Sequence, residues 1–147
     1  MYPDVDSTCI RCHMEPATIG HMFWECTSLT TFWTSIFDAF STICHKTIEP
    51  NPITAIFGVS TDDAPVTSPQ ANFIAFSSLI AQRLILRDWK SEKPPTFTEW
   101  VKDVLSFIPL EKLRYNRFKS PHKFRKAWSP FMEFAHKLSF DYVESTL

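Results

Sequence analysis

Apolar residues along this chain follow the spacing of helices over most of its length. In the segment 29–44 they recur every three or four positions, which places them on one face of a helix. Thr27 or Ser28 is a candidate N-cap, because a hydroxyl there can accept hydrogen bonds from the first free backbone N–H groups. We therefore predict a helix over this segment, with its apolar face formed by Phe32, Trp33, Ile36, Phe37, Phe40 and Ile43.

Capping residues indicate two further helix starts. Ser68 and Pro69 form a favourable start, with serine as N-cap and proline in the first turn. An apolar stripe follows them and reaches Trp89. Thr96 and Glu99 have the spacing of a capping box, in which each side chain accepts a hydrogen bond from the backbone of the other residue. These signals predict one helix after each pair.

Prolines divide the rest of the pattern. Four prolines and a glycine within residues 47–70 predict a loop. Pro109 is expected to end or kink the helix that contains it. Ser120 followed by Pro121 predicts one more helix start, and Pro130 is expected to kink that helix. The loop is expected to be held to the core by a short apolar patch made of Ile53, Ile56 and Phe57.

The composition favours a single folded unit. Of the 147 residues, 44% are apolar, and they include 14 Phe and 5 Trp. Two glycines and 11 prolines suit helices ended by proline better than a hairpin-rich sheet. We predict a mainly α fold in one compact unit, with a small zinc knuckle followed by four to five helices. Within it we distinguish a knuckle segment, 1–30, and a helical domain, 31–147, whose C-terminal half is basic.

Three of the four cysteines lie near the N-terminus in a pattern typical of a metal site. Cys9, Cys12, His21 and Cys26 are spaced as C-x2-C-x8-H-x4-C. Zinc prefers four tetrahedral sulfur or nitrogen ligands, and a C-x2-C turn can present two thiolates to one ion. Gly20 is expected to form a sharp turn that directs the histidine inward. Because the protein would fill all four positions, a zinc ion here would be structural.

Two alternatives to this site stay open on the sequence alone. In one of them Cys26 is a core residue, while Cys9 and Cys12 are surface thiols. In the other, His13 is the nitrogen ligand, although its adjacency to Cys12 makes joint ligation awkward. Cys44 lies in the first predicted helix and is expected to be a small buried apolar residue.

The sequence has no feature of a secreted or membrane-spanning protein. Its first residues, MYPDVDSTC, contain neither the cationic nor the apolar region of a signal peptide. No apolar run approaches the roughly 18 residues that span a bilayer. We therefore expect an intracellular protein of the cytoplasm or nucleus, with no membrane partner and with reduced cysteines.

Charge is unevenly distributed around a formal net charge of −1. Residues 1–70 contain two cations and eight acids, whereas residues 71–147 contain thirteen cations and eight acids. Residues 112–126, the basic stretch, contain seven cations and no acid. This stretch predicts contact with a polyanion through phosphate neutralisation and counterion release. Its cations are Lys112, Arg114, Arg117, Lys119, Lys123, Arg125 and Lys126.

Aromatic residues alternate with the cations of the basic stretch. We expect Tyr115 to be exposed and to stack on nucleic-acid bases, and Phe118 and Phe124 to lie in the core. Arg11, between the first two cysteines, is a weaker candidate for a phosphate contact. The alternative is an ordinary solvated helix face whose aromatic residues all point into the core.

The segment CIRCHMEPATIGHMFWECTSLTTFWTSIF resembles the cysteine-rich segment at the C-terminal end of the replication polyprotein of vertebrate LINE-type non-LTR retrotransposons. The shared marks are C-x2-C, the sequence HMFW with the cysteine after it, and FW at the entry into a helix. The resemblance continues through LIAQRLILRDWKSEKPPTFTEWVKD, LEKLRYNRF and KFRKAWSPFMEF. It implies RNA or single-stranded nucleic acid as partner, in support of reverse transcription, beside the upstream polymerase part of the polyprotein. It also implies zinc-ligand roles for Cys9, Cys12, His21 and Cys26.

No catalytic motif accompanies these features in the sequence. A polymerase needs carboxylates that hold two metal ions, and Asp62 and Asp63 lie instead among prolines in STDDAP. We therefore expect a non-catalytic nucleic-acid-binding module and no enzymatic activity. Two other interpretations are a zinc-folded protein-interaction module and a decayed retroelement fragment without activity.

Overall fold

The computed structural model describes residues 8–61, 65–118 and 120–138. Within these ranges it contains five α-helices and no β-strand, which confirms the mainly α fold. A π-helix, η1 (His21–Glu25), and a 3-10 turn, η2 (Thr27–Leu29), precede the α-helices. No helix among the described residues is long and apolar enough to cross a bilayer. The α-helices are α1 (Thr30–Cys44), α2 (Pro52–Phe57), α3 (Ser68–Arg87), α4 (Phe97–Phe118) and α5 (Pro121–Lys137).

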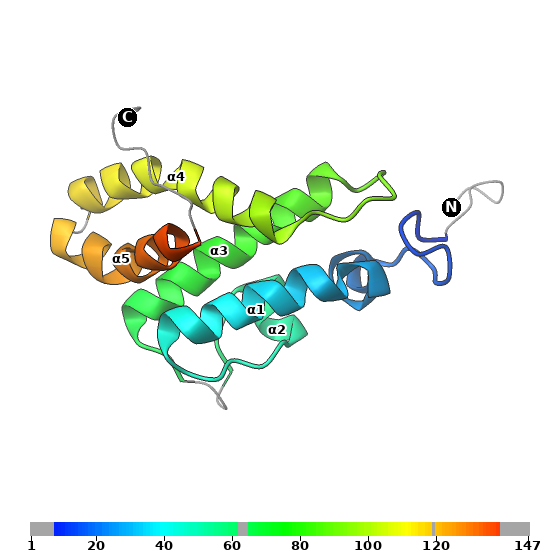
Figure 1. Cartoon of the computed structure of the whole chain (residues 1–147), viewed down its shortest axis with the longest axis horizontal. Coiled ribbons are helices and arrows are strands. Elements are labelled where there is room, and N and C mark those ends of the chain that lie inside the picture. The colour runs from blue at the N-terminus through cyan, green and yellow to red at the C-terminus, as the bar shows by residue number, and fades with distance from the viewer. Residues whose placement is uncertain (1–7, 62–64, 119, 139–147) are drawn as a thin grey trace.

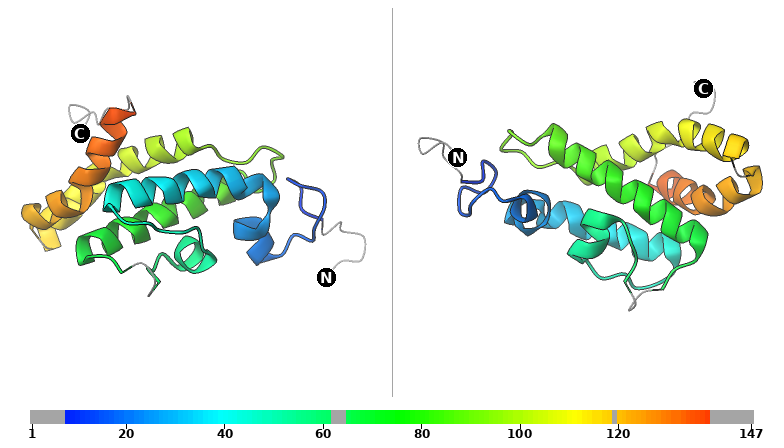
Figure 2. Two further views of the ribbon diagram at one scale, coloured as in Figure 1. Left: turned by 60° about the horizontal axis from the view of Figure 1, so that its bottom comes forward. Right: turned by 180° about the vertical axis from the view of Figure 1, so that it is seen from behind.

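The helices pack into one bundle that is longest along the horizontal axis of Figure 1. α3 contacts α2, α4 and α5, and α1 contacts α4 and α5. The N-terminal loop that contains the first cysteines (blue) lies at one end of the bundle, and the turn between α4 and α5 (yellow to orange) lies at the other. Both views in Figure 2 show the same separation. The cysteine cluster and the basic stretch therefore occupy opposite ends of the molecule.

Side-chain caps begin two of the helices as predicted. Ser120 caps α5 by accepting a hydrogen bond from the backbone N–H of Lys123 at 3.3 Å. Thr96 and Glu99 exchange the two hydrogen bonds of a capping box at the start of α4. Each cap satisfies backbone N–H groups that have no partner inside the first helical turn.

Two other starts differ from the prediction by a residue or more. The N-cap of α3 is Thr67 rather than Ser68, and Gln70 completes a capping box with it. Serine and proline then occupy the first turn, where proline is equally well tolerated. Neither Thr27 nor Ser28 caps α1, because the chain enters that helix directly from the 3-10 turn η2.

The segment 47–70, which we expected to be a loop, contains the short helix α2. Asn51 caps this helix by accepting a hydrogen bond from the backbone N–H of Thr54 at 2.8 Å. Gly58 ends it with a φ of 67°, a left-handed conformation that glycine adopts without a steric penalty. Pro52 occupies the first turn of this six-residue helix, where proline is tolerated, so the prolines of the segment do not exclude it.

Helix α2 is attached to α3 differently from the prediction. Ile53 and Phe57, two of the three residues of the expected apolar patch, are exposed, and the buried residues are Thr54 and Ala55. Gln82 of α3 donates hydrogen bonds to two backbone carbonyl groups near the end of α2, at 2.8 and 2.7 Å. Backbone carbonyls that the helix leaves unpaired are thereby satisfied.

Neither internal proline ends its helix. α4 continues past Pro109, and α5 continues past Pro130. A proline removes one backbone hydrogen bond from a helix. In α4 the residues on both sides of the proline stay packed in the core, since Ile108 and Tyr115 are both fully buried. Tertiary packing on the two sides therefore keeps α4 continuous.

The core is built largely from aromatic rings. Phe40 of α1 lies edge-on to Phe73 of α3 and to Trp100 of α4, with ring centroids 5.9 and 6.0 Å apart. Trp128 of α5 meets Phe73 at 5.4 Å. Edge-on pairs of this kind contribute about 0.5–1.5 kcal/mol each beyond the area they bury. The rings of four helices thus form one continuous core.

Candidate metal centre and nucleic-acid interface

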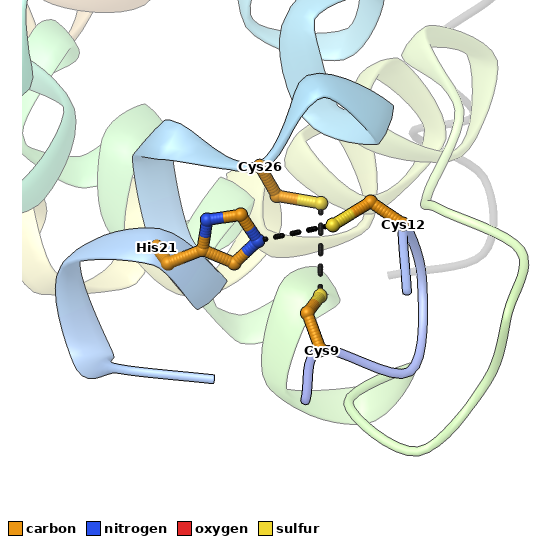
Figure 3. A group of neighbouring side chains, drawn as sticks. All are labelled: Cys9, Cys12, His21 and Cys26. Atoms are coloured by element: carbon orange, nitrogen blue, oxygen red, sulfur yellow. Dashed lines mark hydrogen bonds between the residues drawn. The ribbon is translucent and has the colours of Figure 1, made fainter. Parts of the chain in front are cut away.

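The four predicted metal ligands converge at the N-terminal end of the bundle. In Figure 3 the side chains of Cys9, Cys12, His21 and Cys26 point toward a common centre. Their ligand atoms all lie within 4.8 Å of one another. The Sγ atoms of Cys9 and Cys26 are 3.7 Å apart, and the Sγ atom of Cys12 is 3.3 Å from Nε2 of His21. The four residues are therefore close enough to hold one metal ion.

One separation in the cluster has the length expected of an edge of a tetrahedral zinc site. Zinc binds thiolate sulfur at about 2.3 Å, so two sulfur ligands of one tetrahedron lie about 3.8 Å apart. The observed separation of 3.7 Å between Cys9 and Cys26 is close to this edge. Three cysteines and one histidine form a common ligand set of structural zinc sites. All four positions are supplied by the protein, which favours a folding role over chemistry at the ion.

A tight turn presents Cys9 and Cys12 to the centre. The backbone N–H of His13 donates to the carbonyl of Cys9 at 2.9 Å, and the N–H of Cys9 donates to the carbonyl of Glu15 at 2.8 Å. His13 has a φ of 59°, which closes the turn. Its side chain is 62% exposed and lies 3.8 Å from Glu92. His13 is thus outside the cluster, and the alternative in which it serves as the nitrogen ligand is wrong.

A π-helix brings His21 and Cys26 to the same side of the chain. These residues are five positions apart, and an α-helix with 3.6 residues per turn would point them in different directions. In η1 the backbone N–H of Cys26 donates to the carbonyl of His21 at 2.9 Å, an i to i+5 bond that widens the turn. The sharp turn expected at Gly20 is absent, since its φ of −59° and ψ of −43° are helical. The wider turn of the π-helix therefore allows a histidine and a cysteine with H-x4-C spacing to face the same centre.

Local hydrogen bonds prepare the thiol of Cys12 to lose its proton. The backbone N–H of Met14 is the largest influence that lowers the pKa of this thiol, to about 6, and the backbone N–H of Glu15 and the side chain of His21 lower it further, against the effect of burial. At Cys26, by contrast, burial raises the pKa of the thiol. A metal ligand must be deprotonated. Cys12 therefore meets this requirement more readily than Cys26.

Arg11 does not face solvent, so its expected phosphate contact is wrong. The residue is only 6% exposed. One terminal nitrogen donates to the carbonyl of Met22 at 3.1 Å and the other donates to the carbonyl of Ile85 at 3.0 Å. Ile85 lies in the last turn of α3, where unpaired carbonyls favour a cation. Arg11 therefore connects the cysteine turn to both η1 and α3.

At the opposite end, several cations of the basic stretch project into solvent. The last residues of α4 and the first turns of α5 carry them. None of these side chains forms an ion pair with another described residue. Lys119 belongs to the predicted set but lies outside the described residues. The exposed cations without an ion pair to a described residue are Arg117, Lys123, Arg125 and Lys126.

Two cations at the start of the basic stretch are placed differently. Arg114 donates two hydrogen bonds, each 2.9 Å long, to the carboxylate of Glu111. Glu111 is only 6% exposed, so this pair is part of the bundle. Lys112 is half-buried. The prediction that Arg114 is available for a phosphate therefore neglected an acid that directly precedes the stretch.

The exposed aromatic ring of this region is Phe118 and not Tyr115. Tyr115 is 1% exposed and packs against Phe124, which is buried as expected, with ring centroids 6.0 Å apart. Base stacking by Tyr115 is therefore wrong. Phe118, which we expected in the core, is 72% exposed, and the guanidinium of Arg117 lies over its ring, 5.4 Å from the centroid. Phe118 is the last residue of α4, so no following turn covers it.

A scan against models of known protein families finds none that matches this chain. The metal cluster and the basic stretch are therefore interpreted from their own chemistry. The first is a group of four possible metal ligands brought together by the cysteine turn and η1, and the second is a set of exposed cations beside an exposed ring.

Proposed function

We propose that this chain is a non-catalytic nucleic-acid-binding module, folded around a zinc ion, that binds RNA with low sequence specificity. The main support is the set of four exposed cations at the turn between α4 and α5, which have no acidic partner among the described residues. A polyanionic strand neutralises such a set and releases its own counterions. The resemblance to retrotransposon polyproteins suggests the process that this binding serves, which is reverse transcription.

Each end of the bundle has its own role in this proposal. Zinc held by Cys9, Cys12, His21 and Cys26 supplies folding free energy to the N-terminal loop, and it does no chemistry on the nucleic acid. The opposite end contacts phosphates through its cations and stacks a base on Phe118. Stacking of a base on an aromatic side chain contributes about 1–3 kcal/mol and requires no particular sequence.

A salt titration of RNA affinity tests the proposal. The wild-type protein is compared with a triple charge reversal, Arg117→Glu, Lys123→Glu and Lys126→Glu. For single strands, the logarithm of the binding constant falls with the logarithm of salt with a slope of about −0.7 per neutralised phosphate. We expect a steep slope for the wild type and a shallow one, with weak binding, for the triple variant.

The matched control reverses three exposed lysines elsewhere: Lys90, Lys93 and Lys102. It changes the net charge by the same amount and is expected to keep most of the affinity. Equal loss in the two variants would mean that only the net charge matters. Absence of binding by the wild-type protein at low salt would refute the proposed function.

A second candidate, a protein-interaction module, is favoured by apolar side chains on the same helix. Leu110 and Leu113 are 60% and 65% exposed on α4, about two turns and one turn before Phe118, respectively. Exposed apolar residues that gather on one face are typical of protein interfaces. Under this alternative Leu110→Asn with Leu113→Asn would abolish binding to a polymerase partner, and the triple charge reversal would leave RNA affinity unchanged.

A further inference from the structure

A pocket with two lysine side chains opens between α3, α4 and α5. Its volume is about 270 Å³. It lies where the N-terminus of α3 meets the first turns of α5, at the end of the bundle that contains the basic stretch (Figure 1). The residues that line it are Ser68, Pro69, Asn72, Tyr115, Lys123 and Lys126. We propose that this pocket holds one phosphate group of a bound RNA strand, an inference that rests on the proposed function and gives it a specific site.

The charge of the pocket selects an anion. Lys123 and Lys126 are three positions apart, which places them on the same face of α5. Neither forms an ion pair with a described residue, and no carboxylate lines the pocket. Positive charge at the wall of a concave, partly apolar site attracts anions more strongly than the same charge on a convex surface. A ligand with negative charge is therefore required.

The other wall of the pocket supplies neutral hydrogen-bonding groups. Asn72 and Ser68 come from α3, opposite the two lysines. An amide and a hydroxyl both donate hydrogen bonds without adding charge. A phosphate has several acceptor oxygens arranged around one centre, so it can accept from the ammonium groups and from Asn72 together. A planar carboxylate has only two acceptor oxygens, so some of these donor groups would be left without a hydrogen bond.

Tyr115 separates the pocket from the core. Its ring is 1% exposed, and the little that is accessible faces the pocket. The side chain that appeared in the sequence as a stacking residue is thus a fixed wall beneath the two lysines. Because Tyr115 is packed in the core, this wall of the pocket is already formed before the ligand arrives, which lowers the entropic cost of binding.

Two asparagine variants test the pocket without touching any cation. Both positions are exposed, but Asn72→Asp puts a carboxylate in the lining of the pocket, while Asn116→Asp puts the same charge on α4 within the basic stretch and outside that lining. Asn72 lies near the N-terminus of α3, where an acid is tolerated well, so folding is expected to be intact. We expect Asn72→Asp to weaken RNA binding about tenfold, since a charged hydrogen bond is lost, and Asn116→Asp to weaken it less than about twofold. Equal effects of the two variants, or no effect of Asn72→Asp, would overturn the proposal.

The salt dependence shows whether the two lysines share one phosphate. If they do, the variant Lys123→Gln with Lys126→Gln reduces the salt slope by about 0.7, the value for one phosphate on a single strand. If each lysine binds its own phosphate, the slope falls by about 1.4, and the single-phosphate pocket is wrong. A 5′-phosphorylated oligonucleotide and its 5′-hydroxyl counterpart distinguish a terminal phosphate from a phosphodiester within the chain.

Inorganic phosphate separates failure of the pocket from failure of the proposed function. In an NMR titration of the zinc-loaded protein, phosphate is expected to shift the side-chain amide signals of Asn72. The same titration of the variant Lys123→Gln with Lys126→Gln is expected to leave them unchanged. If the protein binds no RNA and these shifts still occur, the pocket is a phosphate site and the RNA function is wrong. If RNA binds and the shifts are absent, RNA is held elsewhere and the pocket proposal is wrong.

Discussion

Arg11 donates a hydrogen bond to the carbonyl oxygen of Ile85, a residue 74 positions later in the sequence. Through this contact and its hydrogen bond to Met22, the turn that contains Cys9 and Cys12 is fixed against both η1 and the last turn of α3. The cysteine cluster is therefore held to the helical bundle by side-chain hydrogen bonds of Arg11 as well as by the covalent backbone. Its formation and the packing of α3 are expected to depend on each other.

Replacement of Arg11 by methionine tests this connection. The variant keeps much of the side-chain volume and removes the donors to two carbonyl groups. Hydrogen bonds from a charged group contribute about 1.5–3 kcal/mol each, so we expect the loss of two to lower the free energy of unfolding by about 3 kcal/mol or more. Chemical denaturation with urea measures this difference. Arg125→Met, at an exposed position, is the control and should change stability by less than about 0.5 kcal/mol.

Removal of a metal ligand should lower metal content and stability together. Cys12→Ser and Cys26→Ser each leave three ligands, and a structural zinc site loses most of its affinity in that case. We expect about one equivalent of zinc in the wild type by mass spectrometry and little in either variant. Cys44→Ala is the control, because Cys44 is buried but outside the cluster. A wild-type melting temperature that a chelator does not change would show that no metal contributes to the fold.

The thiols should differ in reactivity when metal is removed under mild conditions. The pKa of Cys12 is lowered to about 6, so this thiol is mostly thiolate at pH 7, and burial raises the pKa of Cys44 to about 11. Alkylating reagents attack thiolates. Cys12 is expected to react first with iodoacetamide, at a rate that rises with pH around 6, and Cys44 last. Peptide mass spectrometry locates the label, and prior addition of zinc should protect Cys12.

The pair formed by Arg114 and Glu111 is expected to support the fold rather than bind a ligand. Arg114→Ala leaves the carboxylate of Glu111 nearly buried without its partner. The arginine side chain is 45% exposed, so solvent screens part of the interaction, and we expect a loss of about 1–2 kcal/mol in the free energy of unfolding. Arg117→Ala, without an acidic partner among the described residues, should leave stability unchanged and weaken RNA binding. Thermal melts and RNA titrations of both variants measure the contrast.

Short-range spacing predicted much of the fold and of the metal cluster. The C-x2-C and H-x4-C pairs each act within one turn of the chain, and a single tight turn or π-turn is enough to realise them. The capping box of Thr96 and Glu99 is local in the same sense. Each turn supplies two ligands, so the two turns need only to pack against each other for all four ligands to meet. Features of this kind are visible in a sequence because the interacting residues are close along it.

The errors arose where the partner is distant or the helix ends. Burial of Arg11 depends on a carbonyl of α3, which no spacing around the cysteines reveals. The pocket that we propose for a phosphate was missed altogether, because Asn72 of α3 and Lys123 of α5 line it together although they are far apart in the sequence. Periodicity placed Phe118 in the core because it does not show that α4 ends there. Each case required the tertiary arrangement of the helices.

Tyr115 is buried and Phe118 is exposed, the reverse of what the sequence predicted, and this leads to a final prediction about base stacking. Phe118 is 72% exposed at the end of α4 and has the guanidinium of Arg117 above its ring, whereas Tyr115 is a wall of the core. Removal of a stacking ring costs about 1–3 kcal/mol per base, so Phe118→Ala should weaken RNA binding at least fivefold by this range. Tyr115→Phe keeps the buried ring and should leave RNA affinity nearly unchanged. Fluorescence anisotropy with a labelled single-stranded RNA measures both. A variant Phe118→Trp that retains full affinity would show that the position requires an aromatic ring, and full affinity of Phe118→Ala would place the strand on the cations alone.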